Sequence, residues 1–401
     1  MSPISNETQY TKRFDLNIPA STMAADPSTF SRQLKVPFTE SASDIAKETK
    51  ICQYTLRGLK ESEISHWAAF CADVFAYKSS PPPASYFERH YFNDPRRQAS
   101  LIRVAVYQDE KGGQIVASCR IFRRTISNGS GGAIEAGGIG EVCTANDHRR
   151  RGLSKELLLD CLEIMRQQKN PSIQVSFLHA APEFFPVYKS AGYVNTKTEW
   201  SVVQCQLSSL ESSAKSFLLD SMLLRLARFP EDTAELHKIH GDLNERKYAG
   251  CIVRSHDYWN QYTSKELEGS LSVLLDENGL IMSWLSVRRK SDRIQMRDFG
   301  CIDCNRRGCQ ALTVLLSQAV GDLDLEANET FDLVIPTQVL SQVHESFEKC
   351  SNKDGNSFNA FIWDSMKVEE DLGWMYQPIG PDGFSMPDAS QPHLIWPADS
   401  F

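Results

Sequence analysis

The sequence lacks the features that would place the chain in a membrane, on nucleic acid or outside the cell. No stretch approaches the ~20 consecutive apolar residues of a membrane-spanning helix, because the longest candidate, residues 217–226, is interrupted by Asp220 and Arg225. The 43 basic residues form no stripe and are outnumbered by 51 acidic ones, which argues against nucleic acid as a partner. Residues 1–50 contain no hydrophobic segment that would direct export.

Paired cysteine spacing is also missing. The 11 cysteines are an odd number and lie singly along the chain, unlike those of a secreted disulfide scaffold. The one close pair, Cys301 and Cys304 with Cys309 beyond it, has no second pair and no nearby histidine to complete a zinc site. We therefore expect free thiols, no bound metal and a cytoplasmic location.

The sequence does contain ample material for packed cores. Its 401 residues are 41% hydrophobic and include 20 Phe, 12 Tyr and 7 Trp. A chain of this length is too long for one ordinary domain, so two domains are expected. The net charge of −8 permits a cationic or amine-bearing partner.

The first half has the pattern of a mixed α/β domain. Strand-like segments at 54–57, 102–107, 115–122, 139–144 and 173–179 are interleaved with helical periodicity at 61–75 and 153–167. A loop rich in Gly and Ser is expected over 127–138. The aromatic stretch from Tyr86 to Phe92 is interpreted as core, with a substrate pocket as the alternative.

The second half repeats this order. A hairpin over 271–287, turning at Asn278 and Gly279, matches the first hairpin. Shifting Arg149, Gly152 and Tyr188 by 156 positions gives Asn305, Gly308 and His344 in the same local pattern. This register predicts a tandem duplication.

We divide the chain into a loosely ordered extension (1–50), a first domain (51–206), a second domain (207–350) and a C-terminal segment (351–401). The fold class that follows is α+β, with two mixed twisted sheets flanked by helices and a C-terminal tail.

A glycine-containing loop feeds the predicted helix over 153–167. Arg149, Gly152 and Ser154 stand where backbone N–H groups and the helix dipole can converge on a pyrophosphate. Arg150 and Arg151 would add contacts to phosphate or would be solvated surface charges. An ordinary strand-to-helix turn beside a basic cluster is the alternative.

Residues 142–157 resemble the coenzyme A signature of the GCN5-related N-acetyltransferases, in which Gln or Arg, two residues, Gly, one residue and Gly or Ala precede a helix. Ser154 departs from the usual last residue. The resemblance implies acetyl-CoA as co-substrate, with the pantetheine arm held by backbone groups of a splayed strand. The implied coenzyme-binding residues are Val142, Cys143, Thr144, Arg149, Arg150, Arg151, Gly152, Leu153 and Ser154.

Residues 188–193 are similar to the Tyr-x-x-x-Gly-Phe/Tyr element of the same superfamily. In that element the tyrosine protonates the departing thiolate, so Tyr188 is the implied general acid. A core tyrosine with a satisfied hydroxyl is the alternative.

The whole chain most resembles the tandem-domain enhanced intracellular survival (Eis) acetyltransferases, through residues 148–153 and 248–259. The fungal-type lysine N-acetyltransferases are the nearest alternative. In the Eis proteins the terminal carboxylate, delivered by a third domain, acts as base, which points to Phe401. Only 51 residues follow the second domain, which is short for a third domain. Glu141 is therefore a rival base, with a solvent-facing strand carboxylate as the alternative.

The second copy departs from the signature at Asn305, Gln310, His344 and Glu348. We therefore expect it to be a scaffold that shapes the acceptor pocket. The resemblance as a whole implies an N-acetyltransferase acting on an amine-bearing small molecule or a protein amine, and a homo-oligomer is compatible with it. A non-catalytic acyl-CoA-binding or regulatory module is the alternative.

Overall fold

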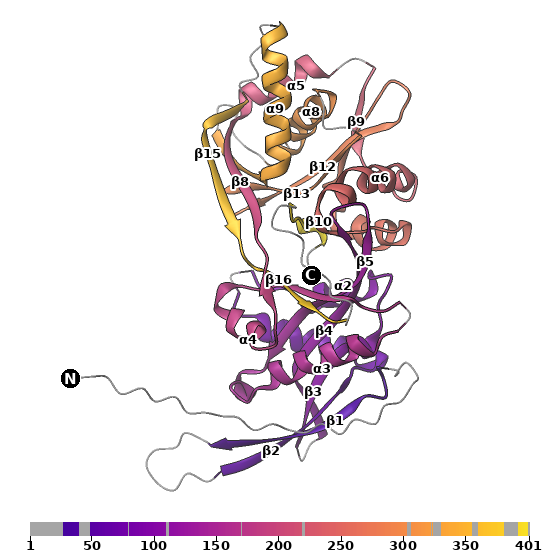
Figure 1. Cartoon of the computed structure of the whole chain (residues 1–401), viewed down its shortest axis with the longest axis vertical. Coiled ribbons are helices and arrows are strands. Elements are labelled where there is room, and N and C mark those ends of the chain that lie inside the picture. Colours follow the sequence, from indigo (N-terminus) through magenta and orange to yellow (C-terminus); the bar gives the residue numbers. More distant parts are fainter. Residues whose placement is uncertain are drawn as a thin grey trace, which may run out of the picture.

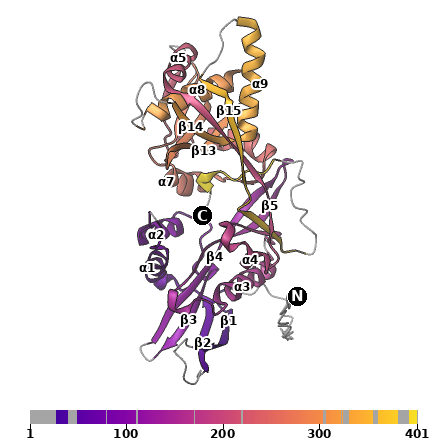
Figure 2. The ribbon, with the colours of Figure 1, turned by 90° about the vertical axis from the view of Figure 1, so that its left-hand side faces the viewer.

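The computed structural model describes residues 27–39, 49–78, 80–109, 112–169, 171–218, 221–302, 306–321, 323, 330–354, 360–380 and 392–399. Two mixed sheets, each flanked by helices, follow one another along the long axis of the molecule (Figures 1 and 2). This arrangement confirms the predicted tandem α+β fold. No helix in these ranges is long and apolar enough to cross a membrane.

The first sheet has the order β1-β2-β3-β4-β5-β6-β16-β7, and β10 pairs with β4 beside it. Its strands run antiparallel except for the parallel pair β5 and β6. The strands are β1 (Ser31–Thr39), β2 (Thr49–Gly58), β3 (Ile102–Asp109), β4 (Gly112–Asn128), β5 (Ala133–Thr144), β6 (Val175–His179), β7 (Val194–Asn195), β10 (Ala249–Ile252) and β16 (Trp374–Pro378).

Helices cover both faces of the first sheet, because successive side chains of a strand point to opposite faces. Val104 of β3 packs with one pair of helices, α1 (Ile64–Phe75) and α2 (Ala84–Phe92). The next residue, Ala105, packs with the other pair, α3 (Leu153–Gln167) and α4 (Phe185–Lys189).

The second sheet has the order β15-β8-β14-β13-β12-β11-β9, with β13 and β14 parallel. Its strands are β8 (Thr198–Gln206), β9 (Leu223–Leu226), β11 (Ser272–Leu275), β12 (Ile281–Lys290), β13 (Arg293–Cys301), β14 (Thr330–Pro336) and β15 (Phe361–Asp371). The helices packed with it are α5 (Leu207–Phe217), α6 (Thr233–His240), α7 (Ser264–Glu266), α8 (Arg306–Gly321) and α9 (Thr337–Asp354).

Short helical segments connect these elements. They are η1 (Glu61–Glu63), η2 (Ala99–Leu101), η3 (Asn146–His148), η4 (Pro182–Phe184), η7 (Pro397–Asp399) and two π-helical turns, η5 (Gly241–Glu245) and η6 (Tyr258–Thr263). The segment η6 continues directly into α7.

The two halves repeat the same parallel unit. Ala136 of β5 pairs with Val175 of β6, and Arg293 of β13 pairs with Asp332 of β14. Each residue of the second pair lies 157 positions after its counterpart, one more than the offset read from the sequence. The predicted duplication is therefore present in the fold.

The two sheets exchange strands. The first domain was predicted to extend to residue 206, but β8 (Thr198–Gln206) lies in the second sheet between β15 and β14. Conversely, β16 comes from the C-terminal segment and fills the first sheet between β6 and β7. Figure 1 shows β8 rising toward the second sheet while β16 lies in the first. Strand pairing therefore crosses the boundaries that we placed at residues 206 and 350.

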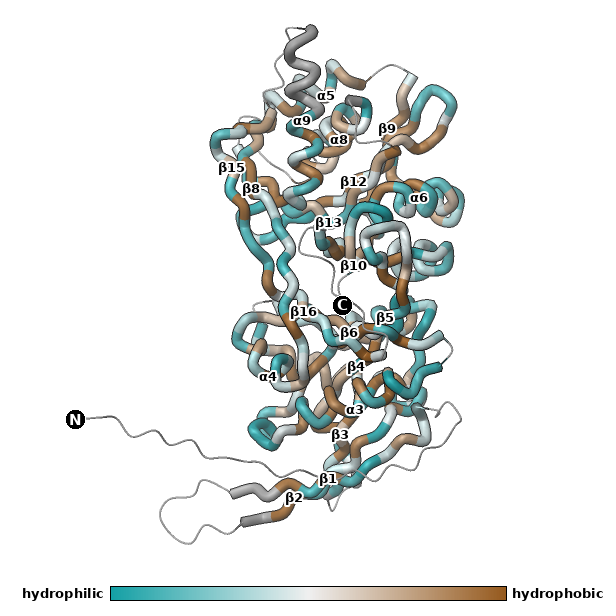
Figure 3. Tube along the Cα trace, viewed as in Figure 1, coloured by the Kyte–Doolittle hydropathy of each residue, from teal (hydrophilic) through white to brown (hydrophobic). Residues whose placement is uncertain are grey.

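Two further expectations are corrected. Residues 31–39, which we assigned to a loosely ordered extension, form β1 and pair with β2. The expected loop over 127–138 is largely a hairpin, in which only residues 129–132 separate β4 from β5. Ile126 and Ile134 pair across this hairpin and pack into the apolar cluster between the sheets. Gly129, Gly131 and Gly132 lie in the turn, whereas Gly137 and Gly138 lie inside β5, between β4 and β6. Figure 3 shows the hydrophobic stretches of β4, β6 and β10 in this region.

The segment 392–399 is buried between the two sheets. Leu394, Ile395 and Trp396 are inaccessible to solvent, and the backbone of Ala249 pairs with Pro392 and Leu394. Asp399 pairs with Arg254 at 2.8 Å, and Arg254 also pairs with Asp298 of β13 at 2.6 Å. All three charged side chains are fully buried. Ion pairs as well as apolar contacts therefore hold the segment in place. Phe401 lies outside the described residues.

The Arg254→Ala variant should lose about 3–5 kcal/mol of unfolding free energy, because two buried carboxylates are left without a cation. Urea unfolding followed by tryptophan fluorescence measures this loss. Arg246→Ala is the control, since Arg246 and its partner Asp242 are 69% and 52% exposed. An exposed ion pair contributes little, so no measurable change is expected there. Equal midpoints for the two variants would contradict the prediction.

Candidate functional site

The loop before α3 has an open backbone. Gly152 adopts the left-handed conformation, with φ at 76°, and forms the N-cap of α3 without any side-chain cap hydrogen bond. A Cβ atom placed at Gly152 would meet no other atom within 4 Å. The first N–H groups of α3 are therefore available to an anion, which the helix dipole would also attract.

The side chains of this loop divide into exposed and anchored groups. Arg149 and Arg150 are exposed, and Arg149 Nε donates to Thr144 O over 3.2 Å. Arg151 is instead engaged by the protein, donating to the hydroxyl of Tyr54 and to Asp147 O. Arg149 and Arg150 are thus the arginines of this loop that are free to contact a phosphate.

The start of α3 is tied to the end of β5. The hydroxyl oxygens of Thr144 and Ser154 lie 2.8 Å apart and share a hydrogen bond. Leu153 is buried in the core under the sheet. The serine that departs from the signature therefore joins the strand to the helix.

The strands β5 and β6 diverge beyond a short ladder. They pair only from Ala136 with Val175 to Gly138 with Phe177, although β5 continues to Thr144. The backbone of residues 142–144 therefore borders a wedge between the two strands. This is the splay that the resemblance implies.

A bulge in β5 lies at the wedge. Ser118 pairs with Cys143 and Arg120 with Gly140, so Glu141 and Val142 together face Cys119. Glu141 has a positive φ of 53°, a strained conformation for a residue with a side chain. Bulges of this kind redirect a side chain.

The redirected Glu141 side chain is buried, with only 6% of its surface exposed. Its Oε1 lies 3.4 Å from Arg120 Nη1, and its Oε2 has no hydrogen-bond partner in the described chain. Burial raises the pKa of Glu141, and the charges of Arg120 and His90 oppose this shift. The alternative of a solvent-facing carboxylate is wrong, because the bulge turns the side chain inward.

Tyr188 lies on α4 and packs in the same apolar cluster as Val142 of β5. It is half-buried, and its ring centroid lies 6.2 Å from that of Tyr193. Its hydroxyl makes no hydrogen bond with the described residues, whereas that of Tyr193 bonds to Ser176 over 2.6 Å. Burial and the Cys119 thiol raise the pKa of Tyr188, so the hydroxyl stays protonated at neutral pH.

Cys143 is a structural residue of the strand. It is buried, and its Sγ lies 3.9 Å from that of Cys71 on α1. Nine cysteines are free thiols: Cys52, Cys71, Cys119, Cys143, Cys161, Cys205, Cys251, Cys301 and Cys309. Within the described ranges, no three His, Cys, Asp or Glu side chains are arranged to hold a metal ion.

The structure adds residues to this site that sequence reasoning had interpreted as core. Phe87 and Tyr91 of α2 do pack in the core. The ring of Tyr86 packs against the same cluster and also lies 4.1 Å from the ring of His90, whose centroid is 5.9 Å from that of Tyr262 of the second domain. The aromatic stretch was the available signal, but its partners lie more than 170 residues away in the sequence.

Buried polar atoms without partners gather at this junction. They share a location between α2, the β4–β5 hairpin and η6, and none makes a hydrogen bond within the described chain. They are Glu141 Oε2, Arg124 Nε and Nη2, and Tyr262 Oη. Such atoms are rare in native proteins, so their concentration indicates a site for a polar ligand or water.

The equivalent wedge of the second domain is filled. The space lined by Phe299, Cys301, Gly308, Cys309, Val339, Gln342 and Val343 measures about 10 Å³, too little for a pantetheine arm. His344, at the position of Tyr188, packs its ring 4.2 Å from that of Trp363. Asn305 lies outside the described residues.

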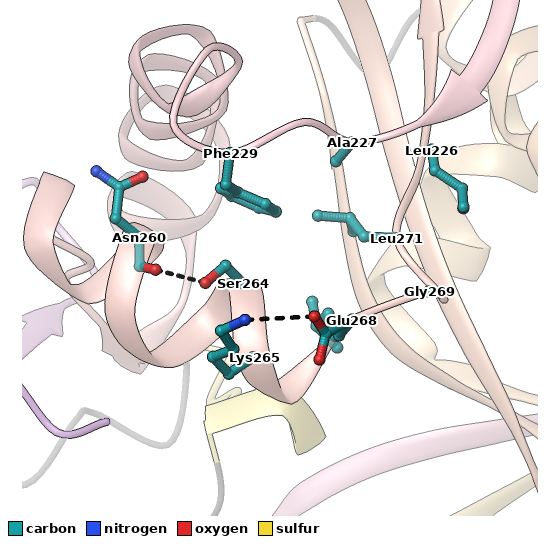
Figure 4. A pocket seen from close by; sticks show the side chains of 10 residues that line it. Leu226, Ala227, Phe229, Asn260, Ser264, Lys265, Glu268, Gly269 and Leu271 are labelled. Atoms are coloured by element: carbon teal, nitrogen blue, oxygen red, sulfur yellow. Dashed lines mark hydrogen bonds and ion pairs between the residues drawn. The ribbon is translucent and has the colours of Figure 1, made fainter. Parts of the chain in front are cut away.

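A larger hollow of about 430 Å³ lies elsewhere on the second domain (Figure 4). Leu226, Phe229 and Leu271 line it, and Lys265 pairs with Glu268 over 3.3 Å beside it. It contains none of the residues predicted from the sequence, so we assign it no part in the site.

Known proteins resemble the first half of the chain in sequence. Residues 55–195 match the family model described as an acetyltransferase (GNAT) domain. The glucosamine 6-phosphate N-acetyltransferase of Trypanosoma brucei brucei is 27% identical over 145 residues, which are 36% of this chain and 92% of that protein.

Two solved structures show the same fold across both domains. A GCN5-related N-acetyltransferase from Kribbella flavida has a TM-score of 0.56 and 16% identity, covering 82% of this chain and 71% of that one. Eis1 from Mycobacterium abscessus has a TM-score of 0.50 and 12% identity, covering 81% and 73%. At these identities the likeness concerns the fold alone.

Proposed function

Because residues 55–195 carry a GNAT acetyltransferase domain, we propose that the first domain transfers the acetyl group of acetyl-CoA directly to a primary amine. One observation carries the proposal. The end of β5 that diverges from β6 carries the buried carboxylate of Glu141, leads to the open backbone at Gly152, and packs through Val142 in the same apolar cluster as Tyr188.

Each border of the wedge has a role in this proposal. The N–H groups at the start of α3 bind the pyrophosphate, and Arg149 and Arg150 neutralise its charge. Backbone groups of Val142, Cys143 and Thr144 hold the pantetheine arm and polarise the thioester carbonyl. Leu153 and Ser154 fix the helix start, and Arg151 holds the loop through Tyr54.

In the proposed reaction, Glu141 and Tyr188 carry out the proton transfers. Glu141 removes a proton from the ammonium of the acceptor, and the neutral nitrogen then attacks the acetyl carbon. The carbon–sulfur bond breaks, and Tyr188 protonates the departing thiolate. The nitrogen gives up its second proton as the amide forms, and this proton restores the Tyr188 hydroxyl. No covalent enzyme intermediate is needed, which agrees with the buried, structural position of Cys143.

The carboxylate of Phe401 is the alternative base or acceptor anchor. Asp399, two residues earlier, is fixed by Arg254 beside Tyr258 at the junction of the two domains. We favour Glu141 because its unpartnered Oε2 is buried at the wedge itself.

Acceptors to test first are small amines, with protein amines as a second class. The trypanosomal relative is described as acting on glucosamine 6-phosphate, which supplies one candidate. The competing function is a module that binds acyl-CoA without turnover. Release of free thiol with an amine panel separates the two.

The wild-type chain should bind one acetyl-CoA, because the second wedge is filled, and Gly152→Glu should abolish this binding by placing an anion at the pyrophosphate site. Isothermal calorimetry measures both. Gly131→Glu is a matched control, since Gly131 also has a positive φ and open space at its Cβ but lies in the β4–β5 turn. A stoichiometry near two, or unchanged affinity in Gly152→Glu, would refute the assignment.

Tyr188→Phe should lower the single-turnover rate by about 10²-fold or more, because the general acid is removed while the ring is kept. Acetyl-CoA affinity should be retained. Tyr193→Phe is the control, since it removes a hydroxyl from the same element that bonds to Ser176. If both variants turn over at the wild-type rate, Tyr188 is not the acid.

A plot of kcat/KM against pH should have an acid limb, in which activity falls as the pH is lowered and Glu141 becomes protonated. The apparent pKa of this limb should lie above the ordinary 4.5, because burial raises the pKa of Glu141. Glu141→Gln should lower kcat/KM by about 10²–10⁴-fold and remove this acid limb. Glu135→Gln, on the same strand and paired with Arg96, should keep the limb. If glycines added after Phe401 abolish the limb and Glu141→Gln does not, the terminal carboxylate is the base.

A further inference from the structure

Residues of the second domain face α2 across the acceptor side of the wedge. His90 Nε2 lies 3.6 Å from Glu266 Oε2 of α7, and Arg297 Nη2 of β13 donates to Glu266 Oε1 over 2.6 Å. Figure 2 shows α7 opposite α2. The second domain thus brings charged side chains to the first domain's site.

This group of charges is continuous with the proposed base. Arg120 lies 3.4 Å from Glu141 and donates to the backbone oxygen of His90 over the same distance. The ring of Tyr86 lies 4.1 Å from that of His90, which joins Arg120 to Glu266. Burial, with added contributions from the charges of Glu266 and Glu141, raises the pKa of Tyr86 to about 12. An acceptor whose amine lies at Glu141 can therefore extend past Tyr86 toward Glu266.

Arg288 of β12 carries a charge that the protein leaves uncompensated. It is half-buried, and its Nε and Nη2 donate to Gln295 Oε1 over 3.1 and 2.9 Å. Among the described residues, no carboxylate lies within 4 Å of Arg288. Arg120, Arg124 and Arg297, by contrast, each have a carboxylate partner.

The surroundings of Arg288 make this charge costly. Burial and the neighbouring charge of Arg297 lower the pKa of Arg288, and Glu266 and Tyr86 are the opposing groups. A partly desolvated guanidinium gains most from an anion that it can bind with two parallel hydrogen bonds. A ligand that extends from Glu141 past Tyr86 would supply this anion.

We propose that the acceptor carries an anionic group in addition to its amine, and that Arg288 of the second domain binds the anion while the amine faces Glu141. This inference rests on the proposed function and names its substrate class. The anion is a phosphate or a carboxylate, and both satisfy the same fork of donors. Polycations without an anion are poor acceptors, because Arg288 and Arg297 repel them.

Two matched pairs of amines test the proposal on the full chain. Glucosamine 6-phosphate is compared with glucosamine, and lysine with cadaverine, so each pair differs by one anion. The wild type should show a kcat/KM at least about 10-fold higher for the anionic member of one pair, and that pair identifies phosphate or carboxylate. Equal or lower values for the anionic members of both pairs overturn the proposal.

The variants Arg288→Gln and Arg289→Gln distinguish direct binding of the anion by Arg288 from a general effect of removing one positive charge. Arg288→Gln should remove the preference through a rise in KM of about 10–100-fold for the anionic member, the range expected for a lost charged hydrogen bond. Arg288→Lys should restore part of it. Arg289, the next residue, is exposed, and its Gln variant should keep the wild-type preference. Identical behaviour of the two Gln variants overturns the proposal.

A binding measurement distinguishes this failure from that of the proposed function. If no amine in the panel is acetylated, the proposed function fails. Calorimetry with glucosamine 6-phosphate and glucosamine, and with lysine and cadaverine, then still decides the inference. The inference is supported if the wild type binds the anionic amine of a pair more tightly than its counterpart without the anion and Arg288→Gln does not. Equal affinities within both pairs overturn the inference.

Discussion

Backbone pairing between β16 and β6 joins a late segment of the chain to the first sheet, and pairing of β8 with β14 and β15 joins the first half to the second sheet. These exchanged strands fix the distance and angle between the domains through hydrogen bonds. A shared apolar cluster around Ile126, Phe177 and Tyr376 fills the space that the crossing creates. The opposition of α2 to η6 and α7, and with it the acceptor side of the site, depends on this exchange.

The sequence was sufficient where local chemistry decides the structure. Helix α3 spans the predicted residues 153–167, because its leucine periodicity and the left-handed Gly152 define its face and its start. The wedge between β5 and β6 followed from the resemblance alone. Local pattern could not show the inward turn of Glu141, because that turn depends on a bulge set by pairing with β4. The place of β16 and the partners of Tyr86 and His90 are long-range consequences of strand exchange.

The second copy shows how a duplicated domain can lose one role and take another. Phe299, Cys309 and Val343 fill the wedge that holds the coenzyme in our proposal for the first copy. The β12–β13 hairpin, which corresponds to β4–β5, also has a bulge, at Arg297, and Arg288 lies on its other strand. In this proposal the hairpin of the second domain provides positively charged side chains for the acceptor bound by the first domain. The second copy thus retains its sheet and loses its coenzyme site.

The position of β16 also bears on synthesis. Strand β16 begins 179 residues after β7 ends, and β7 makes its described strand pairs with β16. Domains generally fold as units from the N-terminal side during translation, but here the first sheet keeps an unpaired edge at β6 until the ribosome has released residues 374–378. That edge is open to chaperones and to misassociation for most of elongation. A translation product that stops before residue 374 therefore leaves the first sheet incomplete, so the first domain matures only after β16 has been synthesised.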